Sequence, residues 1–136
     1  MAKKTKKSVI IARGKRKESI AIASLKEGSG TIRVNSYLLD SINNEFVKSI
    51  ILEPLRVAED ISSKVDITIN VKGGGQMGQA QAAAIAIAKA LVKYQPALKE
   101  RFLAESRTLL IEDVRRVEPK KYKGPKARAR FQKSYR

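Results

Sequence analysis

The fold is decided by VDITINVKGGGQMGQAQAAAIAIAKALVKY, residues 65–94. Its first eight residues alternate apolar and polar side chains from Val65 to Lys72, and this period predicts a strand with one buried face. A glycine-rich connection, 73–79, follows, and the alanine-rich segment up to about Tyr94 predicts a long helix. Because alanine adds little bulk between a helix and its neighbours, we expect this helix to lie close against the sheet.

Three further strands are predicted before this stretch. β-Branched residues favour strands at 8–13, 19–26 and 31–35. A basic turn at 14–18 and a hairpin connection at 27–30 separate them. Strands joined by such short connections pair as an antiparallel meander.

Helical segments are predicted between these strands and residue 65. Ser36 is expected to cap a short helical turn that ends at Asp40. A helix at 45–52 is expected to bury one stripe of side chains, and Pro54 to end it and begin a second helix at 54–60. The expected stripe is Phe46, Val47, Ile50 and Ile51.

The elements after the long helix complete the predicted domain. Pro96 is expected to begin a helix that ends near Glu105, and 108–111 to form a short extended piece. The order of elements predicts an α+β fold, a four-stranded and mostly antiparallel sheet with helices on one face. We divide the chain into a basic N-terminal arm (1–7), a body (8–105) and an extended basic C-terminal tail (106–136).

The composition argues against catalysis and metal binding. The 136 residues include no histidine and no cysteine, so the commonest general base, the commonest transition-metal ligand and all thiolate chemistry are missing. We therefore predict no catalytic residue, no metal and no cofactor. No apolar run approaches the roughly 20 residues of a membrane span, so we expect no membrane partner, and the missing catalytic residue types argue against a small-molecule substrate.

The positive charge is concentrated at the two ends of the chain. The net charge is +16; residues 1–17 carry eight bases and no acid, whereas residues 18–105 carry ten of each. Residues 106–136 carry eleven bases and three acids. A neutral body with two cationic arms is typical of proteins that bind a phosphate backbone. Of the acids, we expect Glu112 and Asp113 to form an ion-paired brace with Arg115 and Arg116.

The glycines at 73, 75 and 78 match the dinucleotide-binding fingerprint in letters only. That fingerprint requires a second parallel strand after the helix, with an acid at its end, but here the helix runs into Pro96 and another helix. Two readings remain open and are compatible. The glycines form a tight strand-to-helix turn, or their bare amides beside Lys72 grip a phosphate of a large RNA.

Four stretches resemble the family of the ninth protein of the small ribosomal subunit. They are ARGKRKESIAIASLKEGSGTIRVN (12–35), EPLRVAED (53–60), VKGGGQMGQAQAAAIAIAKALVKY (71–94) and DVRRVEPKKYKGPKARARFQKSYR (113–136). Their order and spacing cover nearly all of the chain beyond residue 8. The ending QKSYR resembles the archaeal and eukaryotic branch of this family.

The resemblance implies a fold, a place and partners. It implies a ribosomal-protein domain-two-like fold with a left-handed βαβ crossover. It implies a cytoplasmic protein in the head of the small ribosomal subunit, bound to the 3′ major domain of the ribosomal RNA and to neighbouring head proteins. It also implies that the tail contacts the P-site transfer RNA, with Arg136 the strongest candidate, Lys133 the next, and Ser134 and Tyr135 beside them.

The residues expected to bind ribosomal RNA lie in the N-terminal arm, the first strand and the basic turn after it, the glycine connection and the C-terminal tail. They are Lys3, Lys4, Lys6, Lys7, Arg13, Lys15, Arg16, Lys17, Lys72, Gly73, Gly74, Gly75, Gln76, Arg115, Arg116, Lys120, Lys121, Tyr122, Lys123, Lys126, Arg128 and Arg130. Two other classes of function stay open at this point: a basic architectural DNA-binding protein and a nucleotide-binding enzyme that uses the glycine connection.

Overall fold

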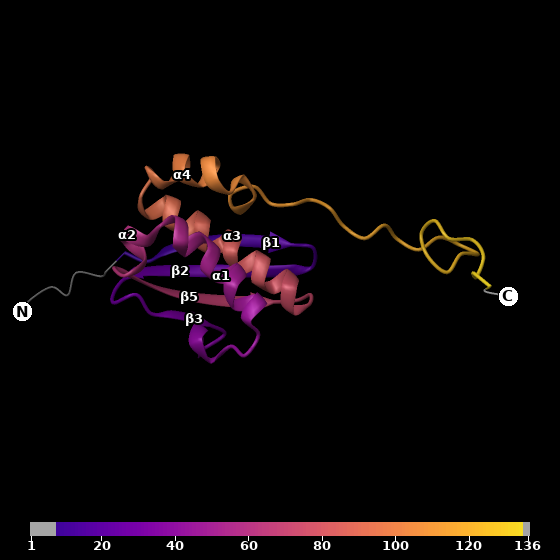
Figure 1. The fold of residues 1–136 in the computed structure, drawn as a ribbon, viewed down its shortest axis with the longest axis horizontal. Helices are drawn as coiled ribbons and strands as arrows, with labels where there is room; N and C mark the ends of the chain where they lie inside the picture. Colours follow the sequence, from indigo (N-terminus) through magenta and orange to yellow (C-terminus); the bar gives the residue numbers. More distant parts are fainter. Residues whose placement is uncertain (1–7, 135–136) are drawn as a thin grey trace, which may run out of the picture.

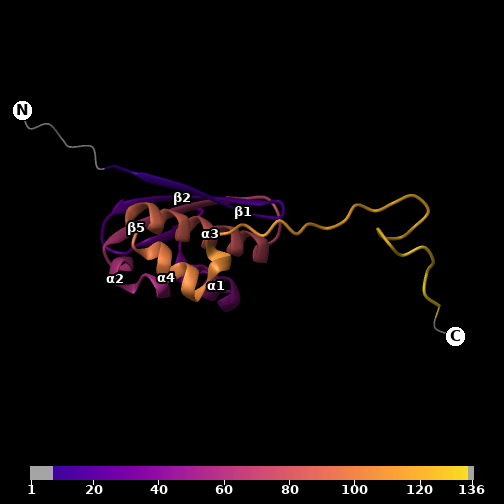
Figure 2. The same ribbon diagram turned by 90° about the horizontal axis from the view of Figure 1, so that it is seen from above.

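The computed structural model describes residues 8–134 and contains one sheet with its α-helices on one side (Figures 1 and 2). The strands lie in the order β1-β2-β5-β3-β4. Only β3 and β5 pair in parallel, through a crossover that contains the first two helices. The strands are β1 (Ile10–Arg16), β2 (Ser19–Glu27), β3 (Ile32–Val34), β4 (Tyr37–Leu38) and β5 (Val65–Lys72).

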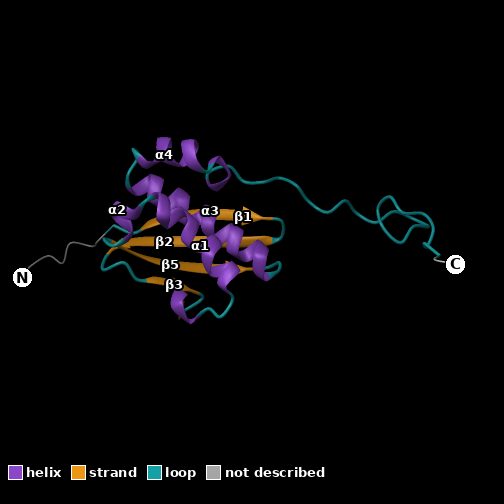
Figure 3. Cartoon of the chain, viewed as in Figure 1, coloured by secondary structure: helices purple, strands orange, loops and turns teal. Residues whose placement is uncertain are grey.

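The helices form a second layer over the sheet (Figure 3). They are α1 (Glu45–Val57), α2 (Glu59–Ser62), α3 (Gln76–Tyr94) and α4 (Leu98–Glu105), with short 3-10 helices η1 (Leu39–Ser41) and η2 (Arg107–Leu109). None of the helices in the described part of the chain is long and apolar enough to span a membrane.

β5 and α3 form the centre of the fold, as predicted. On β5, Val65, Ile67, Ile69 and Val71 are all buried, and the residues between them are not. α3 packs across β1 and β2, and its alanines are almost completely buried. The α+β class is therefore confirmed, with the core between the sheet and α3.

A glycine in β1 sets the distance between the two layers. A Cβ atom on Gly14 would lie 2.2 Å from the carbonyl oxygen of Ala82 and 2.6 Å from the backbone nitrogen of Ala86. Real Cβ atoms do not approach other atoms so closely, so the backbones of β1 and α3 meet here because Gly14 has no side chain.

The sheet has five strands instead of the predicted four. Asn35 and Ser36 both have positive φ (48° and 74°) and form a two-residue turn, so Tyr37 pairs with Val34 where we expected a helical turn. The Asn35 side chain also accepts a hydrogen bond of 2.8 Å from the Val71 amide, which fixes the turn to β5. The basic turn is shorter than the predicted 14–18. β1 continues to Arg16, so only residues 17 and 18 separate β1 from β2.

Two predictions about the first helix were wrong. α1 continues through Pro54 to Val57, and the Pro54 ring is buried. Phe46 was expected in the core but is 77% exposed. The buried positions of α1 are Ile51, Pro54 and Leu55, which lie on one helical stripe; Phe46, five residues before Ile51, falls outside that stripe.

The chain leaves the body after η2, where we expected an extended piece at 108–111. Leu109 is buried and fixes this turn to the body. Residues 110–134 contain neither helix nor strand; the first of them contact the body, and the rest run away from it as a long extended segment that ends in a loop (Figure 1). The predicted extended tail is thus present, but it begins near residue 110 and not at residue 106, because η2 packs on the body.

Candidate nucleic-acid interface

The glycine connection between β5 and α3 is built on the turn between β1 and β2. Gly73 and Gly74 have φ values of 76° and 66°, which favour glycine. The carbonyl oxygen of Gly73 accepts hydrogen bonds from Ser19 Oγ at 3.0 Å and from Gln79 Nε2 at 3.1 Å. A Cβ atom on Gly74 would lie 2.1 Å from Ser19 Oγ. This part of the connection is therefore a tight turn seated on the buried Ser19.

The next residue leaves the start of α3 open. Gly75 is the N-cap of α3 and provides no side-chain hydrogen bond. A Cβ atom placed on Gly75 would meet nothing within 4 Å. The first amides of a helix lack partners within the helix and carry a partial positive charge, so this open end of α3 suits an anion. Both readings of the glycines thus have a structural basis, at different positions.

The basic residues predicted in β1 and β5 gather beside this connection. Lys17 lies in the turn between β1 and β2 with a φ of 52°, and it is exposed. Lys72 ends β5 and pairs with Ile20, which in turn pairs with Lys15. The turn and the glycine connection therefore bring together bases that lie more than fifty residues apart in the sequence.

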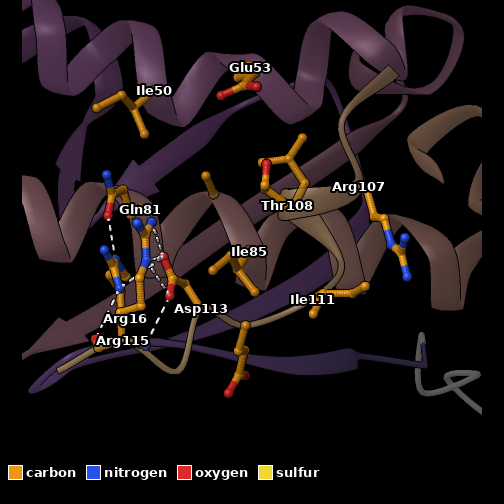
Figure 4. A pocket seen from close by; sticks show the side chains of 13 residues that line it. Arg16, Ile50, Glu53, Gln81, Ile85, Arg107, Thr108, Ile111, Asp113 and Arg115 are labelled. Atoms are coloured by element: carbon orange, nitrogen blue, oxygen red, sulfur yellow. Dashed lines mark hydrogen bonds and ion pairs between the residues drawn. The ribbon is translucent and has the colours of Figure 1, made fainter. Parts of the chain in front are cut away.

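Arg16 has a different environment from its neighbours, because its side chain is only 14% exposed. Its Nε donates a hydrogen bond to Gln81 Oε1 at 2.9 Å, and its Nη1 donates one to the carbonyl oxygen of Arg115 at 3.3 Å (Figure 4). The same Nη1 lies 3.3 Å from Asp113 Oδ2. Arg16 therefore joins α3 to the first part of the tail.

The start of the tail, residues 111–117, is held to the body by ion pairs, and we call it the tail root. Lys89 Nζ lies 2.7 Å from Glu112 Oε1, and Arg116 Nη1 lies 3.8 Å from Glu18 Oε1. Asp113 also contacts Arg115 at 2.6 Å, and the hydrogen bonds from Arg115 hold the pKa of Asp113 far below its ordinary value. The predicted brace is confirmed in part: Asp113 pairs mainly with Arg115, as predicted, whereas Glu112 pairs with Lys89 and Arg116 with Glu18 of the body.

A cavity of about 640 Å³ lies between α1, α3 and the tail root (Figure 4). Ile50, Ile85 and Leu109 contribute apolar walls. Arg16 and Asp113 lie at its edge and are already paired with each other. Within residues 8–134, no group of three acidic, histidine or cysteine side chains is placed to hold a metal ion.

The far part of the tail folds back on itself through one acid, and we call residues 118–128 the tail loop. Glu118 accepts hydrogen bonds from Lys121 at 2.7 Å and from Arg128 at 3.0 Å, and these bonds lower the pKa of Glu118. Tyr122 and Phe131 are 86% and 88% exposed, and the Lys123 ammonium lies 5.7 Å from the centre of the Tyr122 ring.

The predicted site residues fall into three places. One end of the sheet holds Lys15, Arg16, Lys17, Lys72, Gly73, Gly74, Gly75, Gln76, Arg115 and Arg116, and Arg13 lies two residues before Lys15 on the same face of β1. The bases from Lys120 to Arg130 lie along the tail, and Lys133 and Ser134 lie near its far end. Lys3, Lys4, Lys6, Lys7, Tyr135 and Arg136 lie outside the described residues.

Sequence reasoning missed two body residues that anchor the tail root, Gln81 and Lys89, and two exposed bases of the sheet, Lys26 and Arg33. Lys26 and Arg33 were counted with the neutral body. The alternation along their strands provides a signal, since Lys26 follows the buried Leu25 and Arg33 lies between the partly buried Ile32 and Val34.

Comparison with known proteins supports the resemblance. The family described as Ribosomal protein S9/S16 matches residues 14–136. The chain is 44% identical over 129 residues to the small ribosomal subunit protein uS9 of Picrophilus torridus, covering 93% of this chain and 97% of that relative. It is 45% identical to the protein of the same name from Methanococcus maripaludis strain C7, covering 90% of this chain and 95% of that relative.

The family match extends from Gly14 in β1 to the last residue of the basic tail, so it includes the glycine connection, the tail root and the tail loop. The chain belongs to the Ribosomal protein S9/S16 family and is of its archaeal type.

Proposed function

We propose that this protein is a structural constituent of the small ribosomal subunit, that it binds ribosomal RNA in the head, and that the end of its tail contacts the P-site transfer RNA. The relatives named above are proteins of the small ribosomal subunit, and membership of their family makes the chain a structural protein and not an enzyme. Its site of action is then the ribosome in the cytoplasm, beside other head proteins.

The observation that carries the proposal is the tail, which leaves the body with its bases and aromatic side chains exposed (Figure 1). A free chain gains nothing by holding Tyr122 and Phe131 in water. RNA supplies phosphates for the lysines and arginines, and sugar and base faces for the aromatic rings. The stretch 119–130 is assigned to ribosomal RNA along its path.

The length and chemistry of the tail suit a contact far from the body. Eighteen residues, 119–136, span at most roughly 60 Å when extended. Lysine and arginine contacts to phosphates position a nucleic acid without reading its sequence. A contact that must hold every transfer RNA alike needs this property, and it is assigned to Lys133, Ser134, Tyr135 and Arg136.

At the body, the tail root and the glycine connection lie at the same end of the sheet. The open start of α3 at Gly75, with Lys17 in the adjoining turn between β1 and β2, is assigned to a backbone phosphate of ribosomal RNA. The tail leaves the body at this same end of the sheet, so the body and the tail can bind neighbouring parts of one RNA.

Deletion of residues 134–136 tests the transfer RNA contact. We expect the shortened protein to fold and to enter reconstituted small subunits, while P-site transfer RNA dissociates faster from them. Arg56→Gln is the matched control, because it removes one exposed arginine charge from α1. Unchanged dissociation in the shortened subunits would contradict the contact, and equal affinity of the full chain for duplex DNA and ribosomal RNA would favour an architectural DNA-binding protein.

A further inference from the structure

One face of the sheet has no helix over it in the described part of the chain (Figure 2). Alternation along the strands assigns residues to it, because their neighbours Ala12, Ala23 and Ile67 point into the core. We call this surface the open sheet face. Its members are Ile11, Arg13, Lys15, Ile20, Ile22, Ser24, Lys26, Arg33, Asp66, Thr68, Asn70 and Lys72.

The charges of the open sheet face are unbalanced. It has five bases and one acid, and none of the five bases forms an ion pair within residues 8–134. The acid, Asp66, accepts hydrogen bonds from the amides of Ser29 and Thr31, both at 2.9 Å, through Oδ1. Most other acids of the body lie on the helix side, among them Glu45, Glu53, Glu59, Asp60, Glu100 and Glu105. The neutral body is therefore basic on one face.

Strand register spreads these bases over the whole face. Lys15, Ile20 and Lys72 form one row across β1, β2 and β5, and Arg13, Ile22 and Asn70 form the next. A third row places Thr68 beside Arg33 of β3. With strands about 4.8 Å apart and alternate residues about 6.8 Å apart along a strand, each base lies roughly 7–12 Å from the nearest other base of the face.

We infer that the open sheet face binds the sugar–phosphate backbone of RNA, at a surface separate from the tail, with Lys26 and Arg33 as contacts. The inference rests on the proposed function. The bases match a polyanion, Thr68 and Asn70 add neutral hydrogen-bonding groups, and the exposed isoleucines pack on sugars.

The composition of the face favours RNA backbone over a protein partner. The exposed apolar side chains of this face lie beside polar or basic partners, because Ile11 pairs with Ser24, Ile22 with Arg13, and Leu38 of β4 with Arg33. No aromatic residue lies among the members, whereas protein interfaces concentrate their binding energy in aromatic anchors. The same absence excludes base stacking as the mode of binding, so contacts to the backbone remain.

The test removes the two newly assigned bases together. The full-length double variant Lys26→Gln/Arg33→Gln is compared with the wild type in binding a transcript of the 3′ major domain of small-subunit ribosomal RNA. Plotting log K against log salt counts the phosphate contacts, and we expect the slope to fall in magnitude by about 1.5 to 2 for two lost contacts. The matched control is Arg56→Gln/Lys99→Gln, which removes two exposed bases of the helix layer and should keep the wild-type slope.

The outcomes separate this inference from the proposed function. If the wild type binds the transcript and both double variants share its slope, the open sheet face does not contact RNA, and the proposed function stands. If the wild type does not bind the transcript at all, the proposed function itself fails. If the sheet variant binds RNA normally but assembled subunits lose a neighbouring protein, the face binds protein and the inference is overturned.

Discussion

Replacing Gly14 with alanine should push β1 and α3 apart. The added Cβ atom would lie 2.2 Å from the Ala82 carbonyl oxygen and 2.6 Å from the Ala86 nitrogen. Non-bonded atoms prefer separations of about 3.5 Å or more, so the layers must move by roughly 1 Å. Both obstructing atoms belong to the α3 backbone, so no side-chain rotation can relieve the clash.

The cost follows from what this movement disturbs. The packing of α3 on β1 and β2 holds most of the core, and residues such as Ala86 and Ile87 are completely buried there. Adding one methyl group to a tightly packed core costs about 1–3 kcal/mol. We expect the upper part of that range, about 2–3 kcal/mol, because backbone must move; the midpoint of thermal unfolding should fall by on the order of 10 °C.

Urea titration of the full-length variant measures this loss through the midpoint, at an unchanged slope. Gly75→Ala is the matched control: its Cβ meets nothing within 4 Å and its φ of −103° suits any residue. We expect that control to cost less than about 1 kcal/mol, the range of a changed N-cap. A Gly14→Ala protein as stable as the Gly75→Ala protein would refute the argument that the two backbones meet at Gly14.

Two further predictions concern the tail. Arg16→Met keeps the side-chain stem but removes the contacts to Gln81, Asp113 and the tail backbone. The {1H}–15N NOE values at 113–116 should therefore fall, while the urea midpoint of the body hardly moves. Unchanged NOE values would contradict the role of Arg16 in anchoring the tail root. Glu118 has a lowered pKa in the folded chain, so its stabilisation of the tail loop is present above its ordinary pKa of 4.5 and is lost as the pH falls through the lower folded value. Amide shifts at 121–128 should follow that titration, and Glu118→Gln should reproduce the acid spectrum at pH 7; a pH 7 spectrum like that of the wild type would contradict a loop closed by this acid.

The sequence predicted the centre of the fold because the pattern there is unambiguous. The alternation over β5 predicts a strand with one buried face, and the alanine content of α3 predicts a helix close to the sheet; both predictions were confirmed. The failures lie where a local rule competes with packing. Pro54 breaks isolated helices, yet its buried ring lets α1 continue to Val57. Nothing local shows that Asn35 and Ser36 would both adopt positive φ and create β4.

The candidate interface was predictable in part for a similar reason. A charge count along the chain identifies the tail, because its bases stay together in any conformation. The count misses Lys26 and Arg33, since folding places the acids of the body on the helix side and leaves these bases on the other. Likewise, Arg16 belongs to a basic run in the sequence, but the structure turns it inward to Gln81.

The tail loop has a consequence for the working length of the protein. Ten residue steps separate Glu118 from Arg128, which fully extended would span about 33 Å, yet their side chains meet at 3.0 Å. The closed loop therefore shortens the end-to-end distance of the tail, although the number of residues in the tail does not change. If RNA phosphates replaced Glu118 as partners of Lys121 and Arg128, the loop would open and the residues after it could lie farther from the body.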